Sequence, residues 1–289
     1  MRKYYLVTTD HLETGLWFRD EKDFVAGMNF VAIQAHTSKV TVLAFILMSN
    51  HVHFVLYGRW KDVKAFIDGL KSRHSKYLHN KYGTFEFLRR NDADIKEVSS
   101  LDEGLEKAIA YTQMNGVVAN ICSHPSQYPW GTGPVFFSAS KRSGTRLGDL
   151  SKRARIRLLH CCEDDVPSEW LVGAEGYILP ESYVDVRSVE SIFRTPKRMN
   201  YFLVSSSKAK KKMETLEDNM PAFRDQIILA ALPDLFRSMF QKQCFEELTS
   251  EERTESLRQI RFRFCSNVHQ VARVTGLSYE EAARMLDSI

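Results

Sequence analysis

The sequence predicts an α+β fold, a ferredoxin-like split βαβ antiparallel sheet followed by a mainly α-helical C-terminal region. Three observations support this. Over the first half of the chain, strand-like and helix-like segments follow the order strand, helix, strand, strand, helix, strand, which is typical of a split βαβ unit. Apolar residues make up 44% of the chain and charged residues 26%, as in ordinary globular proteins. From Pro221 onward, the pattern is helical throughout.

The first elements are a strand, a helix and two strands. Residues 4–9 are rich in β-branched and aromatic side chains, as strands are. Residues 20–36 start with acidic side chains and continue with helical periodicity. Residues 40–48 are almost continuously apolar, which predicts a buried central strand, and residues 51–57 alternate as the next strand.

The following elements complete the sheet and add further helices. Residues 60–82 carry an apolar stripe with Lys and Arg between its members, which predicts an amphipathic helix. Residues 85–88 and 95–98 have the composition of short strands. Residues 101–122 form a second long helical segment, which ends at the turn-rich residues 123–131.

We expect three regions along the chain: a first domain over residues 1–138, a basic linker rich in Ser, Gly, Lys and Arg over 139–154, and an accessory, mostly helical region over 155–289. Within the last region, residues 267–288 fit a helix-turn-helix, with Gly276 at the turn. Ser278 can cap the second helix, with Glu281 in the capping-box position. Such a hairpin serves as a DNA reader or as a structural element, and the sequence leaves both open.

The charge pattern favours a phosphate-rich partner. The net charge is only +4, but basic clusters recur in the second half of the chain, at residues 141–157, 208–212 and 258–263. A single charge run is usually a solvated surface, whereas three in one half of a chain indicate more.

The sequence also predicts a cytoplasmic protein that is not associated with a membrane. The N-terminus lacks the pattern of a signal peptide, and the strongest apolar run, residues 42–48, is too short to cross a bilayer. The five cysteines have no CxxC spacing, which fits reduced thiols.

Two histidines, His51 and His53, stand at positions i and i+2 of a predicted strand. They therefore share one face, with Cα atoms roughly 6.5–7 Å apart, and their imidazoles can converge on one divalent ion. An isolated HxH pair is weak evidence, because two histidines on a strand also occur by chance.

Tyr111 and Asn115 are spaced i, i+4 on the predicted helix over residues 101–122, so both side chains lie on one helix face about 6 Å apart. On its own, this spacing is equally expected for a structural tyrosine whose ring packs on the sheet.

Three segments together resemble a known family. Residues 47–56, LMSNHVHFVL, resemble the signature strand of HUH single-tyrosine transposases, and best the REP-associated branch with LMPNHVHLLL. Residues 111–121, YTQMNGVVANI, are similar to that branch's YIHLNPVRAGLV, and residues 126–130, SQYPW, to its EDYPWSS. Residues 66–83 resemble its intervening basic helix. The resemblance covers about residues 4–135, in the family's order and spacing.

The chain departs from the family pattern at two positions. Gln113 stands where the family often has His, which puts an auxiliary acid-base role there in doubt. Gly116 replaces the usual proline, which we expect to loosen the backbone after Asn115. Neither change affects the histidine pair or the tyrosine.

The resemblance implies metal-dependent nicking and rejoining of single-stranded DNA next to a hairpin. Tyr111, on what would be the catalytic helix, would attack the scissile phosphate and leave a 5′-phosphotyrosine bond and a free 3′-OH. His51, His53 and Asn115 would hold a divalent cation, Mg²⁺ or Mn²⁺; imidazole suits Mn²⁺ better. The sequence does not identify the group that takes the tyrosine proton.

The expected partner is single-stranded or hairpin DNA, and the sequence leaves the oligomeric state open between monomer and dimer. The basic or polar side chains that we expect to contact DNA lie on helix 60–82 and in the C-terminal tail, namely Lys71, Arg73, His74, Lys76, Arg273 and Arg284. A solvated helix face is the alternative interpretation of the first four.

Two other functions compete with the enzyme. One is a catalytically inactive regulator that binds hairpin DNA or RNA with the same fold. The joint presence of His51, His53 and Tyr111 argues against it, since a pure binder does not need all three. The other is an unrelated metal hydrolase, which would need carboxylate ligands, and the His51 strand carries none.

Overall fold

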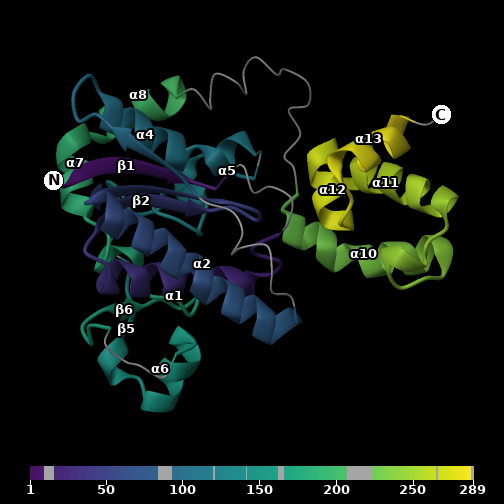
Figure 1. Ribbon diagram of the computed structural model, residues 1–289, viewed down its shortest axis with the longest axis horizontal. Helices are drawn as coiled ribbons and strands as arrows, with labels where there is room; N and C mark the ends of the chain where they lie inside the picture. Colours follow the sequence, from purple (N-terminus) through teal and green to yellow (C-terminus); the bar gives the residue numbers. More distant parts are fainter. Residues whose placement is uncertain are drawn as a thin grey trace.

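The computed structural model describes residues 1–9, 16–83, 93–119, 121–140, 142–161, 166–206, 223–264 and 266–287. The predicted strand over residues 85–88, the basic cluster at 208–212, and Cys162 and Cys265 lie outside these residues. Figure 1 shows a sheet with helices on both faces and, to one side, a group of C-terminal helices. The predicted α+β class is therefore confirmed.

The sheet has four antiparallel strands in the order β2-β3-β1-β4. Their bounds are β1 Lys3–Thr8, β2 Thr41–Leu47, β3 Val52–Gly58 and β4 Asp94–Val98. His53 of β3 lies opposite Thr8 of β1 and Ile46 of β2, so this histidine is in the interior of the sheet. The strand predicted at residues 51–57 begins one residue later than expected.

Two helix layers enclose the sheet (Figure 1). Helices α1 and α2 cover one face and α4, α7 and α8 the other. The bounds of these helices are α1 Glu21–Thr37, α2 Trp60–Tyr82, α4 Gly104–Gln113, α7 Val186–Phe193 and α8 Pro196–Ser205. Smaller elements are α5 Asn115–Val118, α6 Lys152–Leu159, β5 Thr145–Arg146 and β6 Leu171–Val172. Single-turn 3₁₀ helices lie at Pro125–Gln127, Leu147–Asp149, Pro180–Ser182 and Phe245–Glu247.

The start of α1 is fixed by a capping box, as its acidic first residues indicate. Asp20 accepts a hydrogen bond from the backbone N–H of Asp23, whose own carboxylate accepts from the N–H of Asp20. Lys81, at the end of α2, donates to Asp20 Oδ1 and Asp23 Oδ1, both at 2.7 Å. The same carboxylates therefore cap one helix and tie the two helices together.

Packing groups the chain differently from the predicted boundaries at residues 138 and 154. The core around the sheet continues to Leu203 and includes Leu147, Tyr177 and Ile178, all almost fully buried. Asn29 of α1 is wholly buried, and its side chain hydrogen-bonds three backbone groups of residues 158–178. The segment expected to be a linker thus contributes to the core, because a few apolar anchors outweigh its basic composition.

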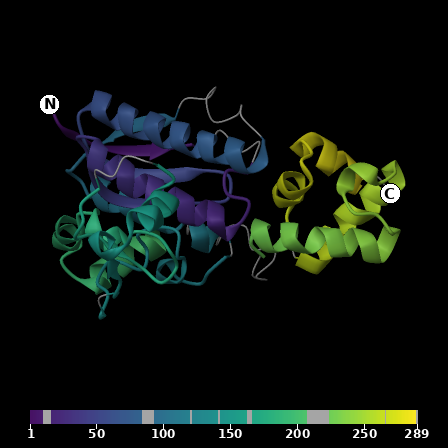
Figure 2. The ribbon, with the colours of Figure 1, turned by 90° about the horizontal axis from the view of Figure 1, so that it is seen from below.

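Helices α10 Asp225–Phe240, α11 Ser250–Phe264, α12 Val268–Thr275 and α13 Tyr279–Asp287 form a second core. Figure 2 shows this helical bundle beside the sheet-containing part. The predicted helical hairpin is present, with Gly276 at φ +73° and a capping box between Ser278 and Glu281. Among the described residues, no helix is both long and apolar enough to cross a membrane.

Candidate active site

His51, which immediately precedes β3, and His53, the second residue of β3, lie side by side. Their ring centroids are 5.0 Å apart, with an angle of 83° between the ring planes. His53 is wholly buried and His51 is half-buried. The alternation of a strand therefore brings the two imidazoles together, as their spacing predicts.

Asn50 orients the first of these histidines. Its Oδ1 lies 2.9 Å from His51 Nδ1. A carbonyl oxygen only accepts, so Nδ1 must carry the proton, and Nε2 is left as the nitrogen with a lone pair. Metal-binding histidines are commonly held in this way by a hydrogen bond to the opposite ring nitrogen. This role of Asn50 was not predicted from the sequence, although Asn50 lies within residues 47–56, which resemble the family's signature strand.

Tyr111, on α4, lies next to the two histidines although it is far from them in the sequence. Its ring centroid lies 5.5 Å from that of His53, and the ring planes are nearly perpendicular at 89°. Its neighbours Ala108 and Ile109 are buried against the sheet and hold α4 in position. A phenol from a helix and an imidazole pair from a strand thus share one site.

Asn115 lies at a break between helices rather than within one. The helix predicted over residues 101–122 begins only at Gly104, and α4 ends at Gln113 before the short α5. The expected placement of Tyr111 and Asn115 on one continuous helix was wrong. Asn115 Nδ2 donates to the carbonyl oxygens of Tyr111 at 3.0 Å and Thr112 at 3.1 Å. Its Oδ1 is therefore the side-chain atom with the chemistry to bind a cation.

The two departures from the family pattern both have structural roles. Gln113 is almost wholly buried, and its Nε2 donates to Thr132 Oγ1 at 2.6 Å. A Cβ at Gly116 would lie 3.1 Å from the ring of Tyr128, so close packing accounts for this glycine. The φ of Gly116 is not positive, and the expected loosening of the backbone finds no support.

The donor set of the site is neutral. The ligands expected from the sequence are two imidazoles and one amide oxygen, and the described residues contain no cluster of three or more His, Cys, Asp or Glu side chains that could hold a metal. These donors fit a divalent first-row metal such as Mn²⁺ better than Mg²⁺, which prefers carboxylate and water oxygens. A cation held by these neutral donors would keep its positive charge available to an anionic ligand.

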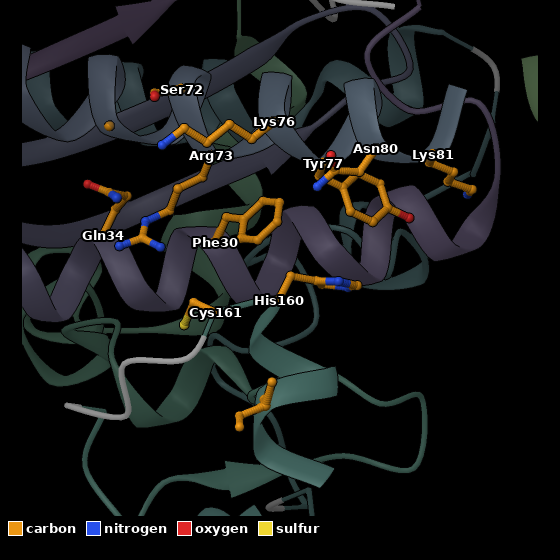
Figure 3. Close-up of a pocket in the computed structure, with 12 residues that line it drawn as sticks. Phe30, Gln34, Ser72, Arg73, Lys76, Tyr77, Asn80, Lys81, His160 and Cys161 are labelled. Atoms are coloured by element: carbon orange, nitrogen blue, oxygen red, sulfur yellow. The ribbon is translucent and has the colours of Figure 1, made fainter. Parts of the chain in front are cut away.

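Helix α2, which carries four of the residues that we expected to bind DNA, lies on the face of the sheet opposite α4, the helix of Tyr111 (Figure 1). Lys71 is buried with its Nζ 3.5 Å from Asp68 Oδ1. His74 is also buried, and its Nε2 donates to Trp17 O at 2.6 Å, so the expectation that it contacts DNA was wrong. Arg73 and Lys76 line a groove between α1, α2 and α6 (Figure 3).

The two arginines of the tail have different surroundings. Arg284 is exposed on α13. Arg273 instead donates through Nε to Asp225 Oδ2 at 3.2 Å, and that carboxylate is 3% exposed. Its guanidinium is already used inside the protein, so a role in DNA binding would require this ion pair to open.

Asp225 also joins the bundle to the site. It accepts hydrogen bonds from Ser49 Oγ at 2.6 Å and from Gln270 Nε2 at 2.7 Å. Ser49 is two residues before His51. The role of Asp225 could not be predicted from the sequence, because no local pattern links residue 225 to residue 49.

Among solved structures, this chain is similar to a REP-associated tyrosine transposase bound to a REP hairpin, with 10% sequence identity and a TM-score of 0.36. The matched region covers 45% of this chain and 76% of that chain. No protein-family model matches the chain, and no curated protein matches its sequence.

Proposed function

We propose that this protein nicks and rejoins single-stranded DNA next to hairpins, through a covalent bond to Tyr111 and with the help of a divalent cation. The observation that carries the proposal is the contact between the rings of Tyr111 and His53, at 5.5 Å between centroids. Two residues 58 positions apart in the sequence (111 − 53) thus lie in contact, and we assign the phenol as the nucleophile and the two imidazoles as metal ligands. The β2-β3-β1-β4 strand order also supports a ferredoxin-like assignment of the sheet.

The proposed chemistry is a transesterification at phosphorus. The phenol of Tyr111 loses its proton as its Oη forms a bond to the scissile phosphorus. The bond between phosphorus and the 3′ oxygen breaks, and that oxygen gains a proton. Rejoining is the reverse step, in which a 3′-OH displaces the tyrosine. The phosphodiester energy is kept throughout, so no nucleotide cofactor is consumed.

The residues around Tyr111 would serve this reaction in different ways. His51 Nε2, the ring of His53 and Asn115 Oδ1 would hold the cation, Mn²⁺ or Mg²⁺, and Asn50 would keep His51 in the binding tautomer. When bound, the cation would polarise a phosphate oxygen and offset the charge that develops on it.

The test is formation of a covalent adduct. Full-length protein is incubated with Mn²⁺ and a hairpin oligonucleotide with a single-stranded flank, labelled at its 3′ end in one sample and at its 5′ end in another. We expect the 3′ label to stay on the protein and the 5′ label to leave on a fragment with a free 3′-OH. Tyr111→Phe should abolish the adduct but leave DNA binding largely intact, because one hydroxyl is a small part of the interface.

The matched control is Tyr201→Phe, at a tyrosine of α8 that is 65% exposed. This variant should form the adduct as the parent protein does. An adduct that persists in Tyr111→Phe would exclude Tyr111 as the nucleophile. Hairpin binding without any adduct, in Mn²⁺ and in Mg²⁺, would instead favour the inactive regulator of DNA or RNA.

A further inference from the structure

A groove lies between α1, α2 and α6 (Figure 3). It is on the face of the sheet opposite α4, the helix that carries Tyr111 (Figure 1). Its cavity has a volume of about 800 Å³, the size of pockets that hold nucleotide-sized ligands. Helix α2 contributes Arg73, Lys76 and Tyr77, and His160 follows α6. None of these residues belongs to the candidate active site.

One end of the groove is cationic. Arg73 is half-buried and Lys76 is exposed, one turn further along α2. No described acidic side chain forms an ion pair with either of them. Lys81, at the other end, differs, because Asp20 and Asp23 both lie within 2.7 Å of its Nζ. The uncompensated charge at the Arg73 end therefore attracts an anion.

The middle of the groove is aromatic. The ring of His160 lies 4.9 Å from that of Tyr77, and both rings lie 6.0 Å from Phe30, which is buried beneath them. His160 is exposed and Tyr77 is half-exposed, so an incoming ring can reach both. Partial burial of the ring, with a smaller effect from Lys81, lowers the pKa of His160 and so favours the neutral imidazole. Aromatic faces beside a cationic rim suit a nucleobase joined to a phosphate.

Helix α6 extends the positive charge beyond the groove. Ile156 faces the cavity, while Lys152, Arg153 and Arg157 are exposed on the same helix. A single nucleotide would not reach all of these side chains, whereas a polynucleotide that crosses the groove would.

We propose that this groove binds a segment of single-stranded nucleic acid, with a phosphate on Arg73 and Lys76 and a base against Tyr77 and His160. This proposal rests on the proposed function, because that function is the reason for choosing nucleic acid as the polyanion that binds in the groove. An acidic peptide would use the cations but has no ring to stack on the aromatic side chains. The strand held here would be a second contact, separate from the scissile phosphate at Tyr111.

The test measures binding alone, so it does not depend on catalysis. Fluorescence anisotropy of a labelled oligothymidylate of about 12 nucleotides, within the usual range of single-strand sites, is followed with full-length protein in EDTA over a salt series. The variant Arg73→Gln with Lys76→Gln should lower the slope of log affinity against log salt by about 1.4, or 0.7 for each lost phosphate contact. His160→Ala should weaken binding about five- to hundredfold without changing the slope.

The control is Lys22→Gln with Lys61→Gln, two exposed lysines on α1 and α2 outside the groove, which changes net charge equally. Thymidine monophosphate and polyglutamate serve as competitors. Equal salt slopes in the two double variants, with unchanged unfolding midpoints, would overturn the proposal. So would competition by polyglutamate as strong as that by oligothymidylate. If the groove variants lose binding and the parent protein forms no Tyr111 adduct, the proposed nicking function is refuted, whereas the proposed binding site in the groove is supported.

Discussion

At the scale of single residues, the hydrogen bond between Asn50 and His51 determines which ring nitrogen of His51 has the lone pair that can bind a cation. Without it, either ring nitrogen of His51 could carry the proton. With Nδ1 protonated against Asn50 Oδ1, the lone pair is on Nε2, a buried atom. The sequence allowed the pairing of His51 with His53 to be predicted from strand alternation, but not the tautomer, because that depends on one side-chain rotamer.

We expect His51→Ala and His53→Ala each to remove metal-dependent adduct formation, and Asn115→Ala to have a smaller effect. An imidazole is a stronger ligand for Mn²⁺ than an amide oxygen. Asn50→Ala, which leaves all three ligands in place, should lower Mn²⁺ affinity about 10–100-fold. Calorimetric titration of the full chain with Mn²⁺ measures this, with His124→Ala at an exposed histidine as control. Adduct formation that continues in EDTA would refute the metal site.

His74 makes the stability of the protein depend on pH. Burial lowers the pKa of His74 from 6.5 to about 4, against a smaller rise from its hydrogen bond to Trp17 O. Between those values the unfolded chain binds a proton that the folded protein does not. The free energy of unfolding should therefore fall as pH drops from 6.5 to 4, by about 3 kcal/mol from this group.

Urea unfolding of the parent protein and of His74→Gln at pH 7 and pH 4.5 tests this. Because glutamine does not titrate, the loss of stability on acidification should be smaller in the variant. His79→Gln, at an exposed histidine of the same helix, should leave the loss unchanged. Equal losses of stability in all three proteins would show that the pKa of His74 is the same in the folded and unfolded states.

At the scale of elements, the four strands of the main sheet were predictable, whereas the short β5 and β6 and the helix break were not. The nearly continuous apolar run before Ser49 and the alternation after it specify β2 and β3 closely. The break between α4 and α5 depends instead on Asn115, whose amide hydrogen-bonds the carbonyls of Tyr111 and Thr112. Such competition between a side chain and the helix backbone has little signature in an amphipathic pattern.

The junction of α1 and α2 should depend on Lys81. Asp23 is wholly buried, and Lys81→Met would remove its cationic partner while leaving the carboxylate in place. Because Lys81 is partly exposed, we expect a loss of about 1–2 kcal/mol in the free energy of unfolding, below the cost for a fully buried pair. Lys64→Met, which removes an exposed pair with Asp68 on the same helix, should cost less than about 0.5 kcal/mol. Equal costs in a urea titration would contradict a structural role for the Asp20–Asp23–Lys81 cluster.

At the scale of the whole molecule, the sequence predicted a sheet-containing first half and a helical tail, but not how they join. Segment 139–154 is basic and polar, yet Leu147 within it is fully buried in the first core. The contact between Asp225 and Ser49 spans 176 residues. Pairings of that range follow from packing, which periodicity and composition do not encode.

Asp225 connects the helical bundle directly to the candidate site through hydrogen bonds. Its carboxylate accepts from Ser49, Gln270 and Arg273, so one buried group links the loop before His51 to α12. A second contact lies nearby, where Gln226 Nε2 donates to Phe18 O at 2.6 Å. Phe18 N in turn donates to Ser49 O at 3.0 Å, so both contacts converge on the same loop.

We therefore expect Asp225→Ala to slow adduct formation as well as loosen the bundle. The change leaves Arg273 without its carboxylate and Ser49 without its acceptor, at a cost of about 2–4 kcal/mol, since Arg273 remains partly exposed. Hydrogen exchange in α10 to α13 should accelerate, and the rate of Tyr111 adduct formation should fall because the Ser49–Asn50–His51 loop is no longer anchored. Asp234→Ala, at an exposed position of α10, should change neither. A truncation of the bundle would be less decisive, since it would remove DNA contacts and the anchor together. Faster exchange in Asp225→Ala with an unchanged adduct rate would show that the bundle is attached to the site without influencing it.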